Sequence, residues 1–134
     1  ASLPSLLIAG FALKLAAPLN RWPLGLEILF ASGTAVAIYA FLTLGRSFAL
    51  LPAVRTIVSD GPFRFIRHPA YAGEFLMVLA CALSQPTLAN AWPAVIVVPL
   101  IGARIIAEES VLKTDPEYQT YSKKVPRRLL PGIW

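Results

Sequence analysis

The segment PAYAGEFLMVLACALSQPTLANAWPAVIVVPLIGARIIA, residues 69–107, decides the fold because it holds two long apolar runs separated by the short polar connection SQPTLAN, residues 84–90. A helix needs about 20 mostly apolar residues to cross the ~30 Å hydrocarbon core of a bilayer. The runs at about residues 69–88 and about 91–107 approach this length. Because the connection is short, we expect two antiparallel membrane helices.

Two further apolar runs lie earlier in the chain, at about residues 3–19 and about 24–44, with the proline-rich turn PLNRWP between them. The first run could pass for a signal peptide, but it lacks a positively charged start and more apolar runs follow it. We therefore interpret it as a membrane helix. Gly45 and Arg46 suit the end of the second helix, because glycine is favoured there and a cation complements the helix dipole.

The composition supports the same class of protein, since 57% of the 134 residues are hydrophobic and only 14% are charged. The sequence predicts an all-α integral membrane protein with about four transmembrane helices. We expect a single membrane domain over residues 1–134, with an N-terminal two-helix hairpin at 1–44 and a core at 45–134.

The net charge of +5 is explained by basic residues that flank the apolar runs. They lie between the second and third runs and after the fourth: Arg46, Arg55, Arg64, Arg67, Lys113, Lys123, Lys124, Arg127 and Arg128. By the positive-inside rule both regions face the cytoplasm, which predicts a multi-pass protein with cytoplasmic N- and C-termini. This topology accounts for the charge, so we expect no nucleic-acid partner. The single cysteine and single histidine argue against an intrachain disulfide and a structural metal site.

The stretch GPFRFIRHPAYAGE, residues 61–74, concentrates polar groups where the third helix is expected to begin. Pro69 suits the first helical turn, and the unpaired N–H groups of a helix start can bind a carboxylate or phosphate. Tyr71 could donate a hydrogen bond or stack, and Gly73 leaves room for a ligand. Taken singly, His68 is equally an interfacial hydrogen-bonding residue, and Arg64 and Arg67 are equally membrane anchors.

Arg104, Glu108 and Glu109 close the fourth run. Arg104 and Glu108 are four residues apart and share a helix face, whereas Glu109 points about 100° away. Two adjacent carboxylates at a helix C-terminus near a membrane require a cationic partner. Arg67, Arg104 or the C-terminal lysines could supply that charge, or the glutamates could bind a ligand. Together with the stretch at 61–74 they form a polar pocket suited to a zwitterion.

These motifs carry a resemblance to a known family. GPFRFIRHPAYAGE followed by RIIAEESVLKTDPEYQTYSKKVPRRLLPGIW, residues 104–134, resembles the C-terminal signature of the isoprenylcysteine carboxyl methyltransferases and their bacterial and archaeal relatives, which are akin to membrane phospholipid N-methyltransferases. LGRSFAL, residues 44–50, is similar to the segment that precedes this signature. The resemblance covers residues 44–134 and does not extend to the first two runs.

The resemblance implies a membrane methyltransferase that uses S-adenosylmethionine. The cofactor pocket would lie at the cytoplasmic end, between the third and fourth helices and the C-terminal segment, and a lipophilic acceptor would enter from the bilayer. Carried over motif by motif, the resemblance implies cofactor-binding roles for Arg67, His68, Pro69, Tyr71, Gly73, Glu108 and Glu109. Carboxylates suit the ammonium of this cofactor, and N–H groups or Arg suit its carboxylate.

Catalytic roles are assigned to Arg104 and Glu108. A carboxylate acceptor is already nucleophilic and needs only alignment and a cation to hold it, for which we choose Arg104, with Arg67 or Arg127 as alternatives. An amine acceptor must lose a proton, and His68 or one of the glutamates would be the base.

The predicted function is therefore methyl transfer to a lipophilic small molecule or prenylated acceptor, in particular the carboxylate of an isoprenylcysteine-like compound. Two alternatives stay open. One is phospholipid N-methylation, and the other is a non-enzymatic membrane subunit that binds anionic lipid through its basic loops. Tyr118 and Tyr121 either cover the cofactor or pack at the surface.

Overall fold

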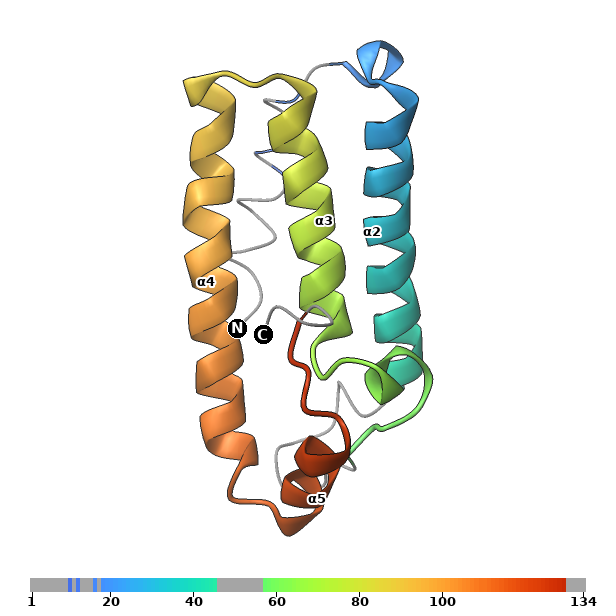
Figure 1. Ribbon diagram of the computed structural model, residues 1–134, viewed down its shortest axis with the longest axis vertical. Helices are drawn as coiled ribbons and strands as arrows, with labels where there is room; N and C mark the ends of the chain where they lie inside the picture. Colours follow the sequence, from blue (N-terminus) through green and yellow to red (C-terminus); the bar gives the residue numbers. More distant parts are fainter. Residues whose placement is uncertain (1–9, 11, 13–15, 17, 46–56, 130–134) are drawn as a thin grey trace.

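The computed structural model describes residues 10, 12, 16, 18–45 and 57–129. Every regular element in these ranges is helical, as expected. The three longer helices stand side by side with α3 in the middle, and α5 lies at one end of them (Figure 1). The elements are the short 3-10 helices η1 (Leu19–Arg21) and η4 (Gly61–Arg64) and the α-helices α2 (Leu24–Leu44), α3 (Pro69–Ser84), α4 (Leu88–Leu112) and α5 (Pro116–Lys124).

The boundaries of the two central helices differ from the expected ones. α3 ends at Ser84 rather than near residue 88, and α4 extends in both directions beyond the expected 91–107. The side chain of Asn90 donates hydrogen bonds to the carbonyl oxygens of Cys81 (2.8 Å) and Gln85 (2.9 Å). This buried amide ties the start of α4 to the end of α3, which shortens the connection to three residues.

α2 packs against α3 through glycines that let the two backbones approach closely. A Cβ atom added to Gly73 would lie 2.5 Å from the carbonyl oxygen of Gly33 and 2.9 Å from the Cβ of Ala37. A Cβ atom added to Gly33 would lie 2.8 Å from the carbonyl oxygen of Gly73. Close approach through small residues is typical of helix pairs in membranes, where packing drives association.

α4 packs against the opposite side of α3 through larger side chains. Val78 of α3 forms a buried cluster with Val97, Ile101 and Ile105 of α4, and Tyr71 and Phe75 border it. The two helices therefore meet along most of their length. The start of α3 and the end of α4, which both carry polar residues, therefore lie side by side near α5.

Among the described residues, α2 is the one helix long and apolar enough to cross a membrane, while α3 is apolar but shorter. The buried residues of α2 are all small, and large apolar side chains such as Leu24, Ile28 and Leu42 point away from the fold. The first expected span, at about residues 3–19, lies mostly outside the described residues, as do Arg46 and Arg55. Four spans and the cytoplasmic orientation therefore stay predictions.

The glycine contact leads to a stability prediction. Gly73→Ala should lower the free energy of unfolding by about 1–3 kcal/mol, because the added methyl group meets backbone atoms that cannot move aside. Gly25→Ala is the matched control, since nothing lies within 4 Å of its added Cβ. It should leave stability unchanged or raise it by up to about 1 kcal/mol through helix propensity. Unfolding in mixed micelles measures both; equal effects of the two substitutions would contradict the packing argument.

Candidate functional site

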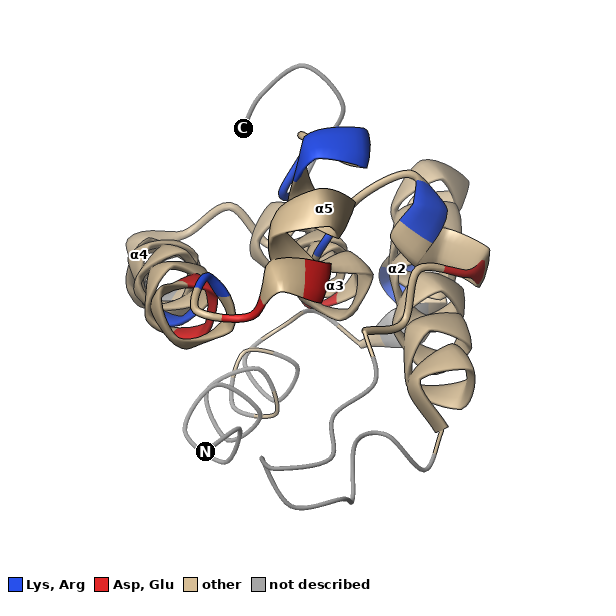
Figure 2. Cartoon of the chain, turned by 90° about the horizontal axis from the view of Figure 1, so that it is seen from below, with Lys and Arg blue, Asp and Glu red and all other residues tan. Residues whose placement is uncertain are grey.

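Three segments distant in sequence meet beside α5: the turn before α3, the last turns of α4 and the segment after α5 (Figure 1). The backbone N–H groups of Arg67 and His68 donate to the carbonyl oxygens of Arg127 and Arg128, both at 2.9 Å. These two bonds pair the C-terminal segment with the turn. Figure 2 views the molecule from this end and shows charges of both signs on α4 and α5.

The turn before α3 is held by α2 and α5. Gly61 has a positive φ of 56°, and a Cβ there would lie 2.9 Å from Oγ1 of Thr43 and 3.1 Å from the hydroxyl of Tyr39, both on α2. Glycine meets both the conformational and the steric demand. From the other side, the hydroxyl of Tyr121 on α5 donates to the carbonyl oxygen of Phe63 at 2.7 Å. The position of His68 therefore depends on both neighbouring elements.

Glu109 is the centre of the site, and its side chain is only 2% exposed. One oxygen, Oε1, lies 3.2 Å from Nη2 of Arg67 and 3.3 Å from Nε2 of His68. The other, Oε2, accepts a 3.0 Å hydrogen bond from Nε of Arg128. A buried carboxylate is tolerable only when paired and hydrogen-bonded, and both conditions are met here. Two arginines of the protein thus supply the positive charge that we expect from the sequence next to the glutamates.

Glu108 faces a different environment, with 43% of its side chain exposed. Its Oε1 accepts a 2.6 Å hydrogen bond from the hydroxyl of Tyr71, and its Oε2 lies 3.8 Å from Nδ1 of His68. The guanidinium of Arg104 lies over the ring of Tyr71, 5.3 Å from its centroid, in a cation–π contact. Glu108 therefore retains a solvent-accessible carboxylate next to an imidazole and a stacked arginine.

His68 is buried between the two glutamates, and burial is the main cause that lowers its pKa below the ordinary value of 6.5. The hydrogen bond to Glu109 and the charge of Glu108 oppose this shift without cancelling it. The imidazole is therefore neutral at pH 7. Since the oxygen of Glu109 can only accept, Nε2 carries the proton and Nδ1 presents a lone pair towards Glu108.

The two tyrosines of α5 are buried and belong to the packing of the site. They form a cluster with Phe63, Ala40 and Val125, so the surface-packing alternative does not describe them. Burial raises the pKa of Tyr118 to about 12, and the negative charge of Glu109 adds to the effect. Both tyrosines are thus neutral hydroxyls that back the carboxylate cluster from the side of α5.

The structure brings together six of the residues singled out in the sequence: Arg67, His68, Tyr71, Arg104, Glu108 and Glu109. Pro69 is buried at the first turn of α3, as expected. Gly73 contacts Gly33 of α2, so helix packing accounts for this glycine. Whether it also borders the cofactor stays a prediction.

Sequence reasoning missed two residues. Arg128, in the tail VPRRLLPGIW, was read only as a flanking charge, although it binds Glu109. Glu74 is buried on α3 one turn beyond Tyr71, and a carboxylate within an apolar run was the signal that could have found it.

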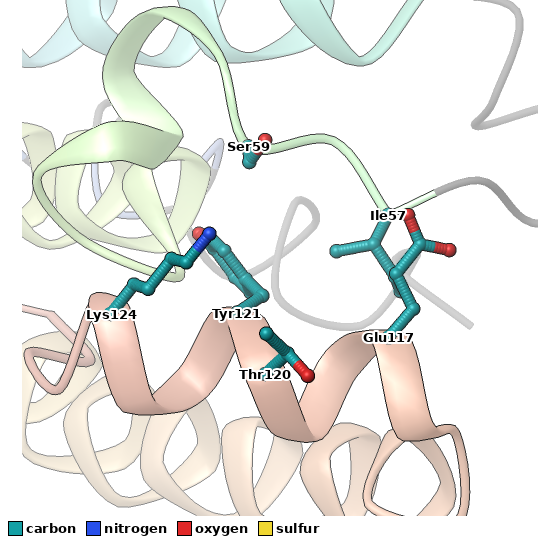
Figure 3. A pocket seen from close by; sticks show the side chains of 6 residues that line it. All are labelled: Ile57, Ser59, Glu117, Thr120, Tyr121 and Lys124. Atoms are coloured by element: carbon teal, nitrogen blue, oxygen red, sulfur yellow. The ribbon is translucent and has the colours of Figure 1, made fainter.

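A separate surface pocket of about 280 Å³ lies between α5 and the segment before η4 (Figure 3). None of the residues that gather around the two adjacent glutamates lines it. Its walls are formed by Ile57, Ser59, Glu117, Thr120, Tyr121 and Lys124.

The neutral state of His68 leads to a prediction for stability against pH. A histidine whose pKa is lowered in the folded state contributes stability above pH 6.5 and loses it as the pH falls. The free energy of unfolding should therefore decrease between pH 7.5 and 5. His68→Asn should flatten this part of the curve. Greater stability at pH 5.5 than at pH 7.5 would show instead that His68 is protonated in the fold.

The two glutamates should differ in their contribution to stability. Glu109→Gln keeps the shape of the side chain but leaves Arg67 and Arg128 without a counter-charge, so the free energy of unfolding should fall by roughly 3–5 kcal/mol. Glu108→Gln, at a half-exposed side chain, should cost under about 1 kcal/mol. The measurement is unfolding of ligand-free protein in detergent, and equal losses would refute this division between the two residues.

Comparison with known proteins indicates a family for this chain. A search of curated proteins gave no match. The model of the phospholipid methyltransferase family, however, matches residues 24–119, from the start of α2 into α5. The match includes the turn before α3, the start of α3 and the end of α4, which supply the residues that gather around the two glutamates, whereas Arg128 lies outside it. Because the matched range covers most of the chain, the protein belongs to the phospholipid methyltransferase family.

Proposed function

We propose that the protein is an S-adenosylmethionine-dependent methyltransferase that acts in the membrane on a lipophilic acceptor. Membership of the phospholipid methyltransferase family supports the reaction class. The observation that carries the proposal is the contrast between the adjacent glutamates. Glu109 is already neutralised by the protein, whereas Glu108 keeps a partly exposed carboxylate beside the lone pair of His68.

The residues present fit this cofactor. Oε2 of Glu108 and Nδ1 of neutral His68 lie 3.8 Å apart and are both acceptors, so the pair leaves room for a shared donor such as an ammonium group. When bound, S-adenosylmethionine supplies an activated methyl group on a sulfonium. Glu108 would hold the amino-acid portion, and Tyr71 would keep the carboxylate of Glu108 oriented through its 2.6 Å hydrogen bond.

Exposed apolar side chains support the membrane setting. Besides those of α2, the large side chains of Val95, Ile96 and Val98 on α4 point away from the fold. Such faces are expected where a helix contacts lipid. With the basic residues at the end near α5, these faces support a multi-pass arrangement with the site at the cytoplasmic interface.

For the acceptor we propose a carboxylate, as in an isoprenylcysteine-like compound. Arg104 lies one helical turn before Glu108 and stacks on Tyr71, so its guanidinium is held next to the site. A carboxylate held by this side chain would attack the methyl group in line and would need no base. Arg104 would then be the residue that aligns the acceptor.

A phospholipid amine is the second candidate, which the family match and the neutral imidazole favour. An amine acceptor is protonated at pH 7 and must lose that proton before it attacks. His68, whose Nδ1 is unprotonated, and Glu108 are placed to receive it. In that case Arg104 would have no acceptor carboxylate to bind.

Cofactor binding is tested by calorimetric titration of the detergent-purified protein with S-adenosylhomocysteine. We expect saturable binding that Glu108→Gln weakens by roughly tenfold or more, the scale of a lost charge-assisted hydrogen bond. Arg64→Ala, at an exposed arginine outside the site, is the control and should bind as the wild type does. No binding by folded protein in detergent and in lipid nanodiscs would favour the non-enzymatic lipid-binding subunit.

The acceptor is tested by transfer of labelled methyl groups to either N-acetyl-S-farnesylcysteine or phosphatidylethanolamine vesicles. A carboxylate acceptor predicts base-labile product from the first substrate and loss of turnover in Arg104→Lys, because lysine lacks the planar bidentate fork. Methylation of the vesicles alone, unaffected by Arg104→Lys, would assign the protein to N-methylation.

A further inference from the structure

Glu109 joins three parts of the chain, and Arg67, which also donates to the carbonyl oxygen of Pro126 at 3.3 Å, joins the same three. Glu109 stands on α4, and its two oxygens bind Arg67 and His68 from the turn before α3 and Arg128 from the segment after α5. The turn and the C-terminal segment are also paired through their backbones. The positions of the side chains of Glu109, Arg67, His68 and Arg128 therefore depend on one another.

We infer that Arg128 is a positioning residue, which through Glu109 holds His68 with its Nε2–H on Glu109 and its Nδ1 lone pair turned towards Glu108. Arg128 acts here through its 3.0 Å bond to Glu109. This inference rests on the proposed function only where it names S-adenosylhomocysteine as the ligand that binds near His68. The orientation of the imidazole itself can be measured without any ligand.

The division of the two carboxylate oxygens of Glu109 carries the argument. Arg128 occupies Oε2 at 3.0 Å, while Oε1 is left to Arg67 and His68 at 3.2 and 3.3 Å. Without Arg128, the carboxylate is free to rotate and can present both oxygens to Arg67. Arg67 carries the full charge and would displace the weaker contact to neutral His68. The imidazole would then lose the acceptor that fixes its tautomer.

The cluster has little capacity to adapt to such a loss. Within the described residues, Nε of Arg67 is buried without a hydrogen-bond partner. The hydroxyl of Tyr118 also interacts with Glu109, whose charge contributes to the raised pKa of this tyrosine. Several donors are thus gathered around the two oxygens of Glu109. A competition for the oxygens of Glu109 is therefore built into the site, and Arg128 limits it by occupying one of them.

The groups that face His68 determine how its titration should respond. They are Glu108 and Glu109 from α4, Arg67 beside it in the turn, and Tyr71 from α3, whose ring centroid lies 5.9 Å away. Arg128 and Tyr118 lie beyond them, next to Glu109. Only the arginines and glutamates are charged near pH 7. Glu109→Gln should lower the pKa of His68 further, because the hydrogen bond to Glu109 is the largest of the causes that raise it.

The test uses the fact that His68 is the only histidine in the sequence. In protein labelled with ¹⁵N-histidine and held in detergent micelles, the imidazole gives one set of nitrogen signals, which report tautomer and pKa directly. For the wild type we expect the Nε2–H tautomer and a pKa below 6.5. Arg128→Ala should mix the two tautomers and weaken S-adenosylhomocysteine binding by roughly tenfold, as when partners that orient ligating histidines are lost.

Arg127→Ala is the matched control. Its side chain is exposed, and only its backbone carbonyl, which alanine retains, bonds to Arg67. The histidine signals and binding should stay those of the wild type. Arg128→Lys keeps the charge and should return the signals towards the wild type. If Arg128→Ala does not fold, Arg128→Gln takes its place, because it keeps a side-chain donor while removing the charge.

Two results would overturn the inference: an Nδ1–H tautomer in the wild type, or unchanged histidine signals in Arg128→Ala or Arg128→Gln. Failure of the proposed function looks different. Wild-type protein that shows the expected tautomer and its loss in Arg128→Ala, but binds no S-adenosylhomocysteine, would keep the positioning role and reject the methyltransferase.

Discussion

The buried carboxylate of Glu109 is the interaction on which the polar end of the protein depends. Its burial is costly unless the charge is paired and hydrogen-bonded, and Arg67, His68 and Arg128 together meet that demand. As a consequence, the turn before α3 and the segment after α5 are drawn onto α4. The need to neutralise this one charge therefore brings the parts of the site together. The arrangement of the site depends on which donors bind each of the two oxygens of Glu109.

The apolar part of the molecule provides the frame for this cluster. α3 approaches α2 at backbone distance through Gly33 and Gly73, and it meets α4 through a layer of branched side chains around Ile101 and Ile105. Tight packing on both sides gives α3 little freedom to shift. The first turn of α3, with His68 and Tyr71, is consequently held against the last turns of α4, where a small displacement would separate the imidazole from both glutamates.

Two adjacent residues of one type have different roles because a helix turns by about 100° between them. Glu109 points into the fold, where two arginines neutralise it, and Glu108 points to the partly exposed side, where Tyr71 orients it. Because of the same rotation, Nε2 of His68 faces Glu109 and Nδ1 faces Glu108. A neutral imidazole with a fixed tautomer results, next to a carboxylate that stays accessible. This is a suitable setting for a cationic or zwitterionic ligand in a family that transfers methyl groups.

Most of the helical segments and most of the site could be predicted from the sequence, because apolar runs, proline positions, the polar stretch at 61–74 and the two adjacent glutamates are local signals. The helix at 24–44 and the gathering of His68, Tyr71 and Glu108 follow from such signals. The extent of α4 and the binding of Glu109 by Arg128 could not be predicted, since Asn90 and Arg128 act on residues that only tertiary contacts bring near. Local chemistry determined which residues are polar, charged or small. The tertiary structure alone decided which carboxylate is neutralised and which stays accessible, because that choice depends on where the C-terminal segment folds back.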